Sequence, residues 1–204
     1  MPQLVDSSFM ELRHASTDRP VHVVVPERRF FAIEGIGAPA TIDYALAGAI
    51  LRRVAQTAWR RSPVRPAAIP TPLLETIWWQ PALTADAVPT AFGDRRTWHW
   101  RQLVEAPRVL TDDEARQAIE ASGRASGDPT EFVRLLTFAE GPALQLLLVG
   151  DPDGEQDTVG RLFAALAAET LEPSGQVHEL RLRDVGDVPV GRGRAIIRAP
   201  YLTH

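Results

Sequence analysis

One series of predicted secondary-structure elements occurs twice in this 204-residue chain, and this duplication constrains the fold more than any other feature. Residue patterns predict the order strand–strand–helix–strand–strand in each half. In the first half the elements are expected over 21–25, 29–34, 44–59, 73–80 and 97–105. In the second half they are expected over 132–138, 143–149, 158–172, 177–183 and 194–199. Such a duplication predicts an α+β fold made of two similar modules, with a cleft where they meet.

The chain divides into a polar N-terminal arm over 1–20 and one domain over 21–204, whose repeats span about 21–110 and 111–204. Asp43 is the predicted N-cap of the first helix. Thr111 and Glu114 have the spacing of a capping box, so an additional helix is expected to begin there and to end near Gly123. The loop at Glu140 is expected to join two strands of a hairpin.

Composition excludes several kinds of chemistry. The chain has no cysteine and no lysine, so thiolate, disulfide and Schiff-base chemistry are excluded. The net charge of −4 argues against direct binding of nucleic acid. No apolar run is long enough to span a membrane, and no signal peptide is evident, which predicts a cytoplasmic protein. The histidines lack metal-ligand spacing, so neither a metal site nor a cofactor is expected.

Four of the five tryptophans occur in two short segments that are predicted strands. Trp78 and Trp79 are adjacent, and Trp98 and Trp100 flank His99. Indoles provide large flat apolar surfaces with an N–H donor at the edge. They can therefore line a pocket for a planar aromatic ligand, or they can form a tryptophan-rich core. The sequence leaves both interpretations open.

Several segments together resemble the GyrI-like small-molecule-binding proteins, in their stand-alone bacterial branch. The similar segments are Phe31-Ala32-Ile33-Glu34-Gly35 followed by Gly37 and Pro39, Pro72 to Trp79, Trp98-His99-Trp100, His178-Glu179-Leu180 and Arg198-Ala199-Pro200. Their order and spacing hold from about Val21 to Pro200. The Leu-Glu-x-x-Trp-Trp segment with its downstream Trp-x-Trp is the most specific of them.

The resemblance implies duplicated modules of SHS2 type, in which antiparallel strands and helices surround a central pocket. Members bind flat, hydrophobic, often cationic molecules, and some are effector-binding domains of transcription regulators. Some stand-alone members resemble cyclopropyl hydrolases, which detoxify DNA-alkylating antibiotics of the yatakemycin type by opening a strained ring. One departure is the His-x-Gly-x-Tyr stretch of the family. Leu148 to Pro152 stand in its place, so no role of that histidine or tyrosine is carried over.

Glu179 is the candidate catalytic residue, expected to orient or deprotonate a water molecule that attacks the activated cyclopropane. The candidate ligand-binding residues are Tyr44, Glu75, Trp78, Trp79, Trp98, Trp100 and Arg198. Strand alternation places Glu179 on one face with Val177 and Arg181, and Glu75 on one face with Trp79. Each carboxylate can instead form an ordinary ion pair, and Arg198 can instead anchor the chain end.

Two functions from different classes remain. The first is hydrolysis of the cyclopropane ring, without a metal, as a means of antibiotic resistance. The second is a non-catalytic protein that sequesters or senses planar, possibly cationic, aromatic drugs. An interaction with DNA gyrase is suggested by the family name alone. The oligomeric state is not determined by the sequence.

Overall fold

A computed structural model of the chain describes residues 11–38, 41–62, 73–80, 96–150, 155–183 and 193–203. Within these ranges it has three α-helices, two short 3-10 helices and nine strands. In chain order the elements are η1 (Glu11–Arg13), β1 (Val21–Val25), β2 (Arg28–Ile36), α1 (Ile42–Arg61), β3 (Leu74–Trp79), β4 (His99–Glu105), α2 (Asp112–Ser126), η2 (Thr130–Phe132), β5 (Arg134–Phe138), β6 (Gly141–Val149), α3 (Glu155–Ala168), β7 (Glu172–Pro173), β8 (Val177–Arg183) and β9 (Arg194–Leu202).

The strand order confirms the predicted α+β fold with duplicated modules. The sheet is antiparallel and runs β1-β6-β9-β8-β3-β4-β2-β5, with β7 added beside β9. The counterparts in the two series are β1 and β5, β2 and β6, β3 and β8, and β4 and β9. Exchanging the members of each pair reverses the strand order and leaves every pairing unchanged. The first strand of each series pairs with the other series, since β1 lies beside β6 and β5 beside β2. The centre of the sheet is the β3–β8 pair, one strand from each series.

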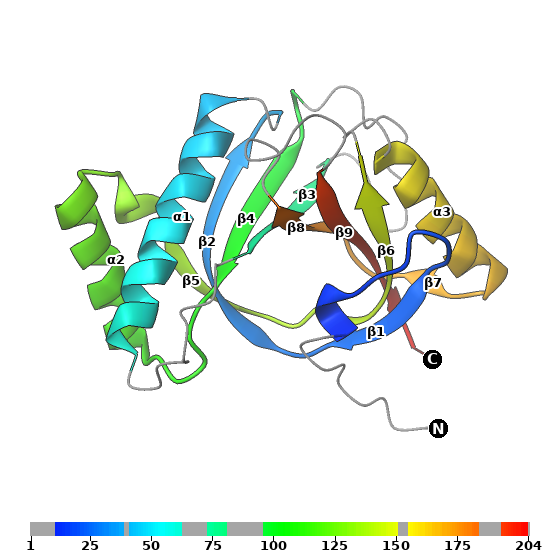
Figure 1. Cartoon of the computed structure of the whole chain (residues 1–204), viewed down its shortest axis with the longest axis horizontal. Helices are drawn as coiled ribbons and strands as arrows, with labels where there is room; N and C mark the ends of the chain where they lie inside the picture. Colours follow the sequence, from blue (N-terminus) through cyan, green and yellow to red (C-terminus); the bar gives the residue numbers. More distant parts are fainter. Residues whose placement is uncertain are drawn as a thin grey trace.

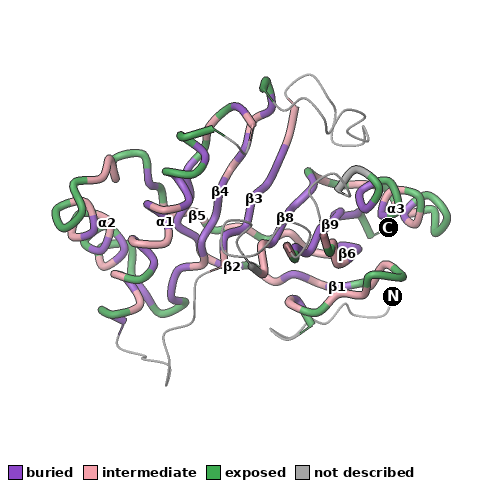
Figure 2. Tube along the Cα trace, turned by 45° about the horizontal axis from the view of Figure 1, so that its top comes forward, coloured by how far each residue is buried: buried purple, intermediate pink, exposed green. Residues whose placement is uncertain are grey.

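The sheet curls, and the helices lie outside the curl (Figure 1). α1 packs on β2 and β4, α3 packs on β6 and β9, and α2 packs against α1. We call the side that α1 and α3 cover the helix face and the other side the inner face. Both sides are buried over the central strands, as Figure 2 shows for β3, β8 and β9. The largest hydrophobic cluster joins the helices to the helix face, and smaller clusters occupy the inner face.

Three of the differences between the observed and the expected helix ends have a local cause. Thr41, not Asp43, is the N-cap of α1, because its hydroxyl accepts a hydrogen bond from the Tyr44 N–H at 3.3 Å. α2 has the predicted Thr111–Glu114 capping box but continues to Gly127, whose φ of 73° ends the helix. α3 ends at Ala168 rather than near 172, because Thr170 has a φ of 55° and the chain then pairs with β9 as β7.

The described part of the N-terminal arm is attached to the inner side of the sheet. Leu12 in η1 is buried, and its carbonyl accepts a hydrogen bond from Arg198. The side-chain amide of Gln145 donates to the carbonyls of Glu11 and His14. Buried side chains of β6 and β9 therefore satisfy the backbone of η1, which positions this turn over the inner face.

Candidate functional site

Glu179 lies at the centre of the sheet on the helix face. Its backbone pairs with Thr76, so its side chain reaches Trp78 on the adjacent strand. The Trp78 indole N–H donates to Oε2 of Glu179 at 3.2 Å, and Arg181 Nε donates to Oε1 at 3.0 Å. Each carboxylate oxygen therefore receives one N–H donor from a fixed neighbour. Because a carboxylate oxygen accepts two hydrogen bonds, each oxygen keeps capacity for a water molecule or a ligand.

An aromatic cluster surrounds this carboxylate. The Tyr44 ring, from the first turn of α1, stacks on Trp78 with centroids 5.3 Å apart and 16° between the planes. Its edge faces Trp100 at the same centroid distance. The Tyr44 hydroxyl hydrogen-bonds Thr76 Oγ1 at 2.9 Å. Burial and the nearby Glu179 carboxylate raise the pKa of Tyr44 to about 12, so the phenol stays protonated near neutrality.

The close approach of Trp100 to the backbone depends on a glycine. A Cβ placed on Gly35 would lie 2.2 Å from an indole carbon of Trp100. Glycine at position 35 therefore lets the Trp100 ring lie across β2. Within the described residues, the Trp100 indole N–H is buried without a hydrogen-bond partner.

Three of the predicted ligand-binding tryptophans, namely Trp78, Trp98 and Trp100, belong to the main hydrophobic cluster and are almost fully buried. They are core residues, and Trp78 also hydrogen-bonds Glu179. Beside these rings, the Glu179 side chain is buried at 9% exposure, and the Arg181 side chain is only slightly more open at 17%. Ligand contact with the indoles stays a prediction.

Three further predicted ligand-binding residues, Glu75, Trp79 and Arg198, lie on the inner face. Glu75 and Trp79 alternate with Thr76 and Trp78 along β3, and Arg198 on β9 pairs with His178 rather than with Glu179. The face assignments expected from alternation hold, but the eight candidate residues do not form one site. The predicted set divides because neighbouring residues of a strand point to opposite faces.

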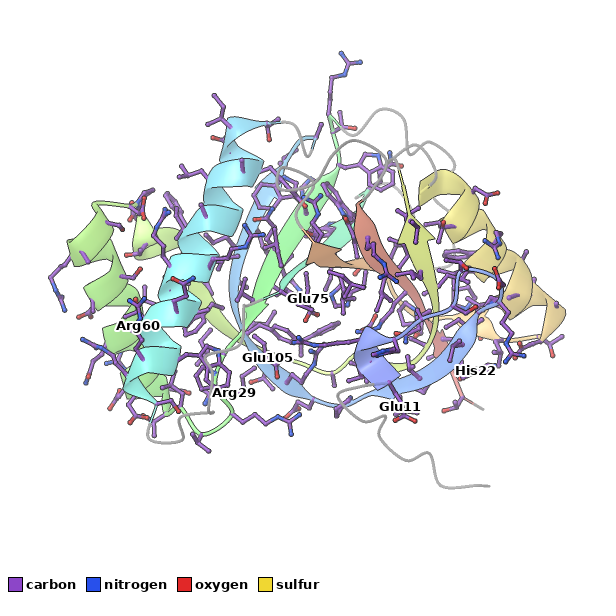
Figure 3. All side chains as sticks on the ribbon, viewed as in Figure 1. Glu11, His22, Arg29, Arg60, Glu75 and Glu105 are labelled. Atoms are coloured by element: carbon purple, nitrogen blue, oxygen red, sulfur yellow. The ribbon has the colours of Figure 1, made fainter. Side chains whose placement is uncertain are left out.

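Glu75, which Figure 3 labels, and Arg198 belong to a buried chain of charges on the inner face. Arg28 makes two hydrogen bonds to Glu75, at 3.2 and 3.3 Å. His178 Nε2 lies 3.2 Å from Glu75 Oε2, close enough for an ion pair although not aligned as a hydrogen bond. Nδ1 of His178 lies 3.1 Å from Glu140 Oε2, which also accepts from Arg198. The interaction order is therefore Arg28–Glu75–His178–Glu140–Arg198.

The alternation of positive and negative groups shifts the pKa values of the side chains in this chain of charges. Burial alone would raise the pKa of Glu75, but Arg28 and His178 hold that pKa at about 2. Burial opposes ionisation of Glu140 too, but His178 and Arg198 outweigh it and lower the pKa of Glu140. For His178, burial lowers the pKa and the two carboxylates raise it more strongly. The chain of charges thus consists of three cations and two anions. At its end, Glu105 lies 3.5 Å from Arg28.

These shifts predict that stability is greatest between about pH 4.5 and pH 6.5. The pKa of Glu75 and Glu140 is lowered in the folded state, so their contribution is present above the unfolded value of 4.5 and is lost as the pH falls. The pKa of His178 is raised, so its contribution is present below the unfolded value of 6.5 and is lost as the pH rises through the folded value. Urea unfolding across pH measures this, and His178→Asn should flatten the alkaline side. An unchanged alkaline side in that variant would contradict the assignment.

Sequence patterns did not identify some residues that matter here. Arg181 was expected only as a possible ion-pair neighbour, yet it contacts both Glu179 and Tyr44. Glu140 was expected only as part of a hairpin connection, and its side chain is buried. A charged residue in a turn is usually solvated, so the sequence carried no signal that this carboxylate points inward.

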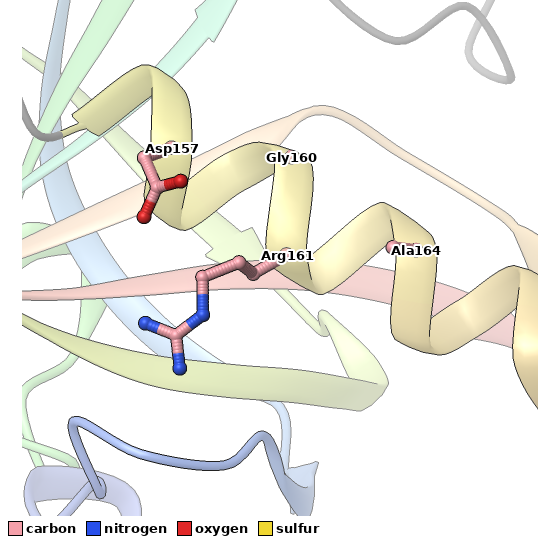
Figure 4. A pocket seen from close by; sticks show the side chains of 4 residues that line it. All are labelled: Asp157, Gly160, Arg161 and Ala164. Atoms are coloured by element: carbon pink, nitrogen blue, oxygen red, sulfur yellow. The ribbon is translucent and has the colours of Figure 1, made fainter.

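Two surface depressions lie apart from the residues around Glu179. One, of about 590 Å³, is open and lies along α3, lined by Asp157, Gly160, Arg161 and Ala164 (Figure 4). The other, of about 430 Å³, lies at the β5 edge and is lined by Ala32, Glu34, Arg101, Phe132, Arg134, Leu135 and Leu136. Neither joins a carboxylate to buried aromatic rings. Among the described residues, no group of three or more His, Asp or Glu side chains is placed to hold a metal ion.

Comparison with known proteins supports the fold. A conserved protein of Listeria innocua superposes with a TM-score of 0.81 and 24% identity, over 95% of this chain and 97% of that chain. A protein of Listeria innocua named as a hydrolase gives 0.77 and 24%, over 95% and 96% of the chains. The C-terminal domain of EcmrR gives 0.57 and 8%, over 91% and 98%. No family model matches the chain, and no curated protein sequence matches it.

The class of protein that these features define is an α+β fold built of two duplicated antiparallel modules. The structural neighbours fit that fold. At the identities found, the neighbours define the fold and not the activity. Within the described residues, none of the helices combines the length and the apolar character that crossing a membrane requires.

Proposed function

We propose that this protein is a stand-alone GyrI-like protein that binds planar, hydrophobic aromatic molecules beside Glu179 and hydrolyses the cyclopropane ring of DNA-alkylating members of that class. The observation that carries the proposal is the Glu179 carboxylate, held by the Trp78 and Arg181 N–H groups next to the Tyr44 ring. The solved Listeria structures named as hydrolases share the fold, which is consistent with hydrolysis.

The proposed reaction needs little from the protein beyond orientation and one proton acceptor. The water oxygen forms a bond to the unsubstituted ring carbon while the ring C–C bond breaks. The electron pair of that bond passes into the conjugated dienone, whose oxygen becomes a phenolate. Glu179 accepts the proton of the attacking water, and that proton returns to the phenolate through solvent. The net change is addition of one water molecule, driven by relief of ring strain and by aromatisation.

Each side chain has a distinct role in this scheme. Trp78 and Arg181 fix the carboxylate, so one lone pair can be directed at water. Tyr44 is held by Thr76 and by its stacking on Trp78, which gives the apolar side of the site a rigid shape. A ligand would approach from the side of Arg181, the more exposed of the two charged groups.

The test is to incubate purified protein with a cyclopropane-bearing alkylator of the yatakemycin class and to follow it by liquid chromatography with mass detection. We expect a product heavier by one water, formed over many turnovers. A protein that binds the compound, as measured by equilibrium dialysis, but leaves its mass unchanged would refute catalysis. Such a result would favour the second candidate, a protein that sequesters or senses drugs.

A further inference from the structure

We infer that Arg181 is a specificity-determining residue, which makes the site select uncharged planar ligands over organic cations. The inference rests on the proposed function, because it assumes that ligands bind beside Glu179. It goes further by naming the charge of the ligand class. It also differs from the expectation based on resemblance, which included cationic molecules.

Arg181 already occupies the position that an organic cation would take. An aromatic ring together with a carboxylate is the usual arrangement for binding such a cation. Here the guanidinium carbon of Arg181 lies 5.3 Å from the centroid of the Tyr44 ring. Its Nε donates to Glu179 at 3.0 Å. Arg181 therefore covers the face of the Tyr44 ring and pairs with the negative charge of Glu179.

The strand geometry explains why Arg181 reaches this position. Arg181 follows Glu179 by two residues on β8, so the two side chains lie on the same face. The backbone of Arg181 pairs with Leu74 on β3 and with Ala195 on β9. An arginine on a central strand is positioned by neighbours on both sides. Because the backbone of Arg181 is held in this way, its guanidinium lies beside Glu179 and Tyr44.

The charges predict opposite effects on cationic and neutral ligands. Glu179 and Arg181 form a neutral pair whose side chains are largely shielded from water, so screening between them and a bound ligand is weak. A cationic ligand must displace the guanidinium or lie beside it, and both are unfavourable. A neutral aromatic ligand meets no such repulsion, and the planar guanidinium can stack on its ring. Removal of Arg181 would leave the Glu179 charge available to a cation.

Acridine and N-methylacridinium provide a matched pair of probes, because they share one ring system and differ in charge. Their dissociation constants would be measured by equilibrium dialysis at mildly alkaline pH, where acridine is uncharged. The variant Arg181→Met keeps an apolar side chain of similar length and removes the charge. Arg181→Lys keeps the charge, and Arg124→Met is the control on the exposed surface of α2. Circular dichroism would check that each variant is folded.

We expect wild type to prefer acridine, and Arg181→Met to bind N-methylacridinium about tenfold or more tightly than wild type does. Arg181→Lys and Arg124→Met should keep the preference of wild type. The double variant Arg181→Met, Glu179→Gln should lose the gained affinity for the cation. An unchanged ratio of the two affinities in folded Arg181→Met would overturn the inference and leave the proposed function standing. Failure of every variant to bind either probe would instead overturn the proposed binding site, and the inference with it.

Discussion

Substitution of Glu179 by glutamine is expected to lower kcat for ring hydrolysis by about 10²- to 10⁴-fold, the usual contribution of a positioned general base. The amide keeps the shape of the side chain and an oxygen that can accept from the Trp78 N–H, but it cannot take a proton from water. Affinity for a neutral planar ligand should change little, because that ligand does not depend on the carboxylate charge. The measurement combines turnover, followed by mass detection, with equilibrium dialysis of the unreacted ligand.

Glu120→Gln is the matched control for this experiment, since Glu120 is an exposed residue of α2 and its pairing with Arg124 is a surface contact. It should hydrolyse the substrate at the wild-type rate. Full activity in Glu179→Gln would show that another group activates the water. Equal loss of turnover and of neutral-ligand binding would show that the substitution disturbs the site, and Glu179 would then have no demonstrated role as a base.

The order of elements was predictable because each signal is local. The β8 strand occurs over the predicted residues, and the Thr111–Glu114 capping box starts α2 as expected. Both depend on side chains a few residues apart. The pairing of β1 with β6 and of β5 with β2 was not predictable, because no local pattern specifies which distant strand a given strand will join. The division of the chain into repeats at about residue 110 stays a prediction.

The candidate site was predictable in part for the same reason. Alternation correctly placed Glu179 with Arg181 and Glu75 with Trp79, but it does not tell which of two faces binds a ligand when both are buried. In a half-buried sheet, the polar residues identify the solvent side. Here β3 is buried along nearly all of its length on both faces, so a polar residue such as Glu75 does not identify a solvent side. The partners of Glu75 come from β2 and β8, which lie far away in the sequence.

The two carboxylates on β3 and β8 illustrate how one sheet carries two kinds of charged group. Glu75 is completely enclosed by Arg28 and His178, which leaves its oxygens occupied inside the protein. Among the described residues, Glu179 has one N–H donor on each oxygen, and its side chain is 9% exposed. The first arrangement suits a structural role, and the second leaves capacity for a further partner. This difference is why the proposed function uses Glu179 and assigns Glu75 to the stability of the inner face.

Substitution of Glu75 by glutamine is expected to destabilise the fold by about 3–5 kcal/mol, because it leaves buried positive charge on Arg28 and His178 without its counter-charge. This loss is a large part of the roughly 5–15 kcal/mol that stabilises a typical domain. Urea unfolding at about pH 6, where the chain of charges is intact, measures it as a shift of the midpoint at unchanged slope.

The exposed Glu120→Gln variant should change stability by less than about 0.5 kcal/mol. Adding Arg28→Met to Glu75→Gln should restore part of the loss, because the double variant removes the uncompensated guanidinium together with the carboxylate. The cycle of the two single variants and the double variant then gives the coupling between these side chains directly. A Glu75→Gln protein as stable as wild type, or a double variant whose losses simply add, would mean that the inner-face charges are not held as an interdependent chain.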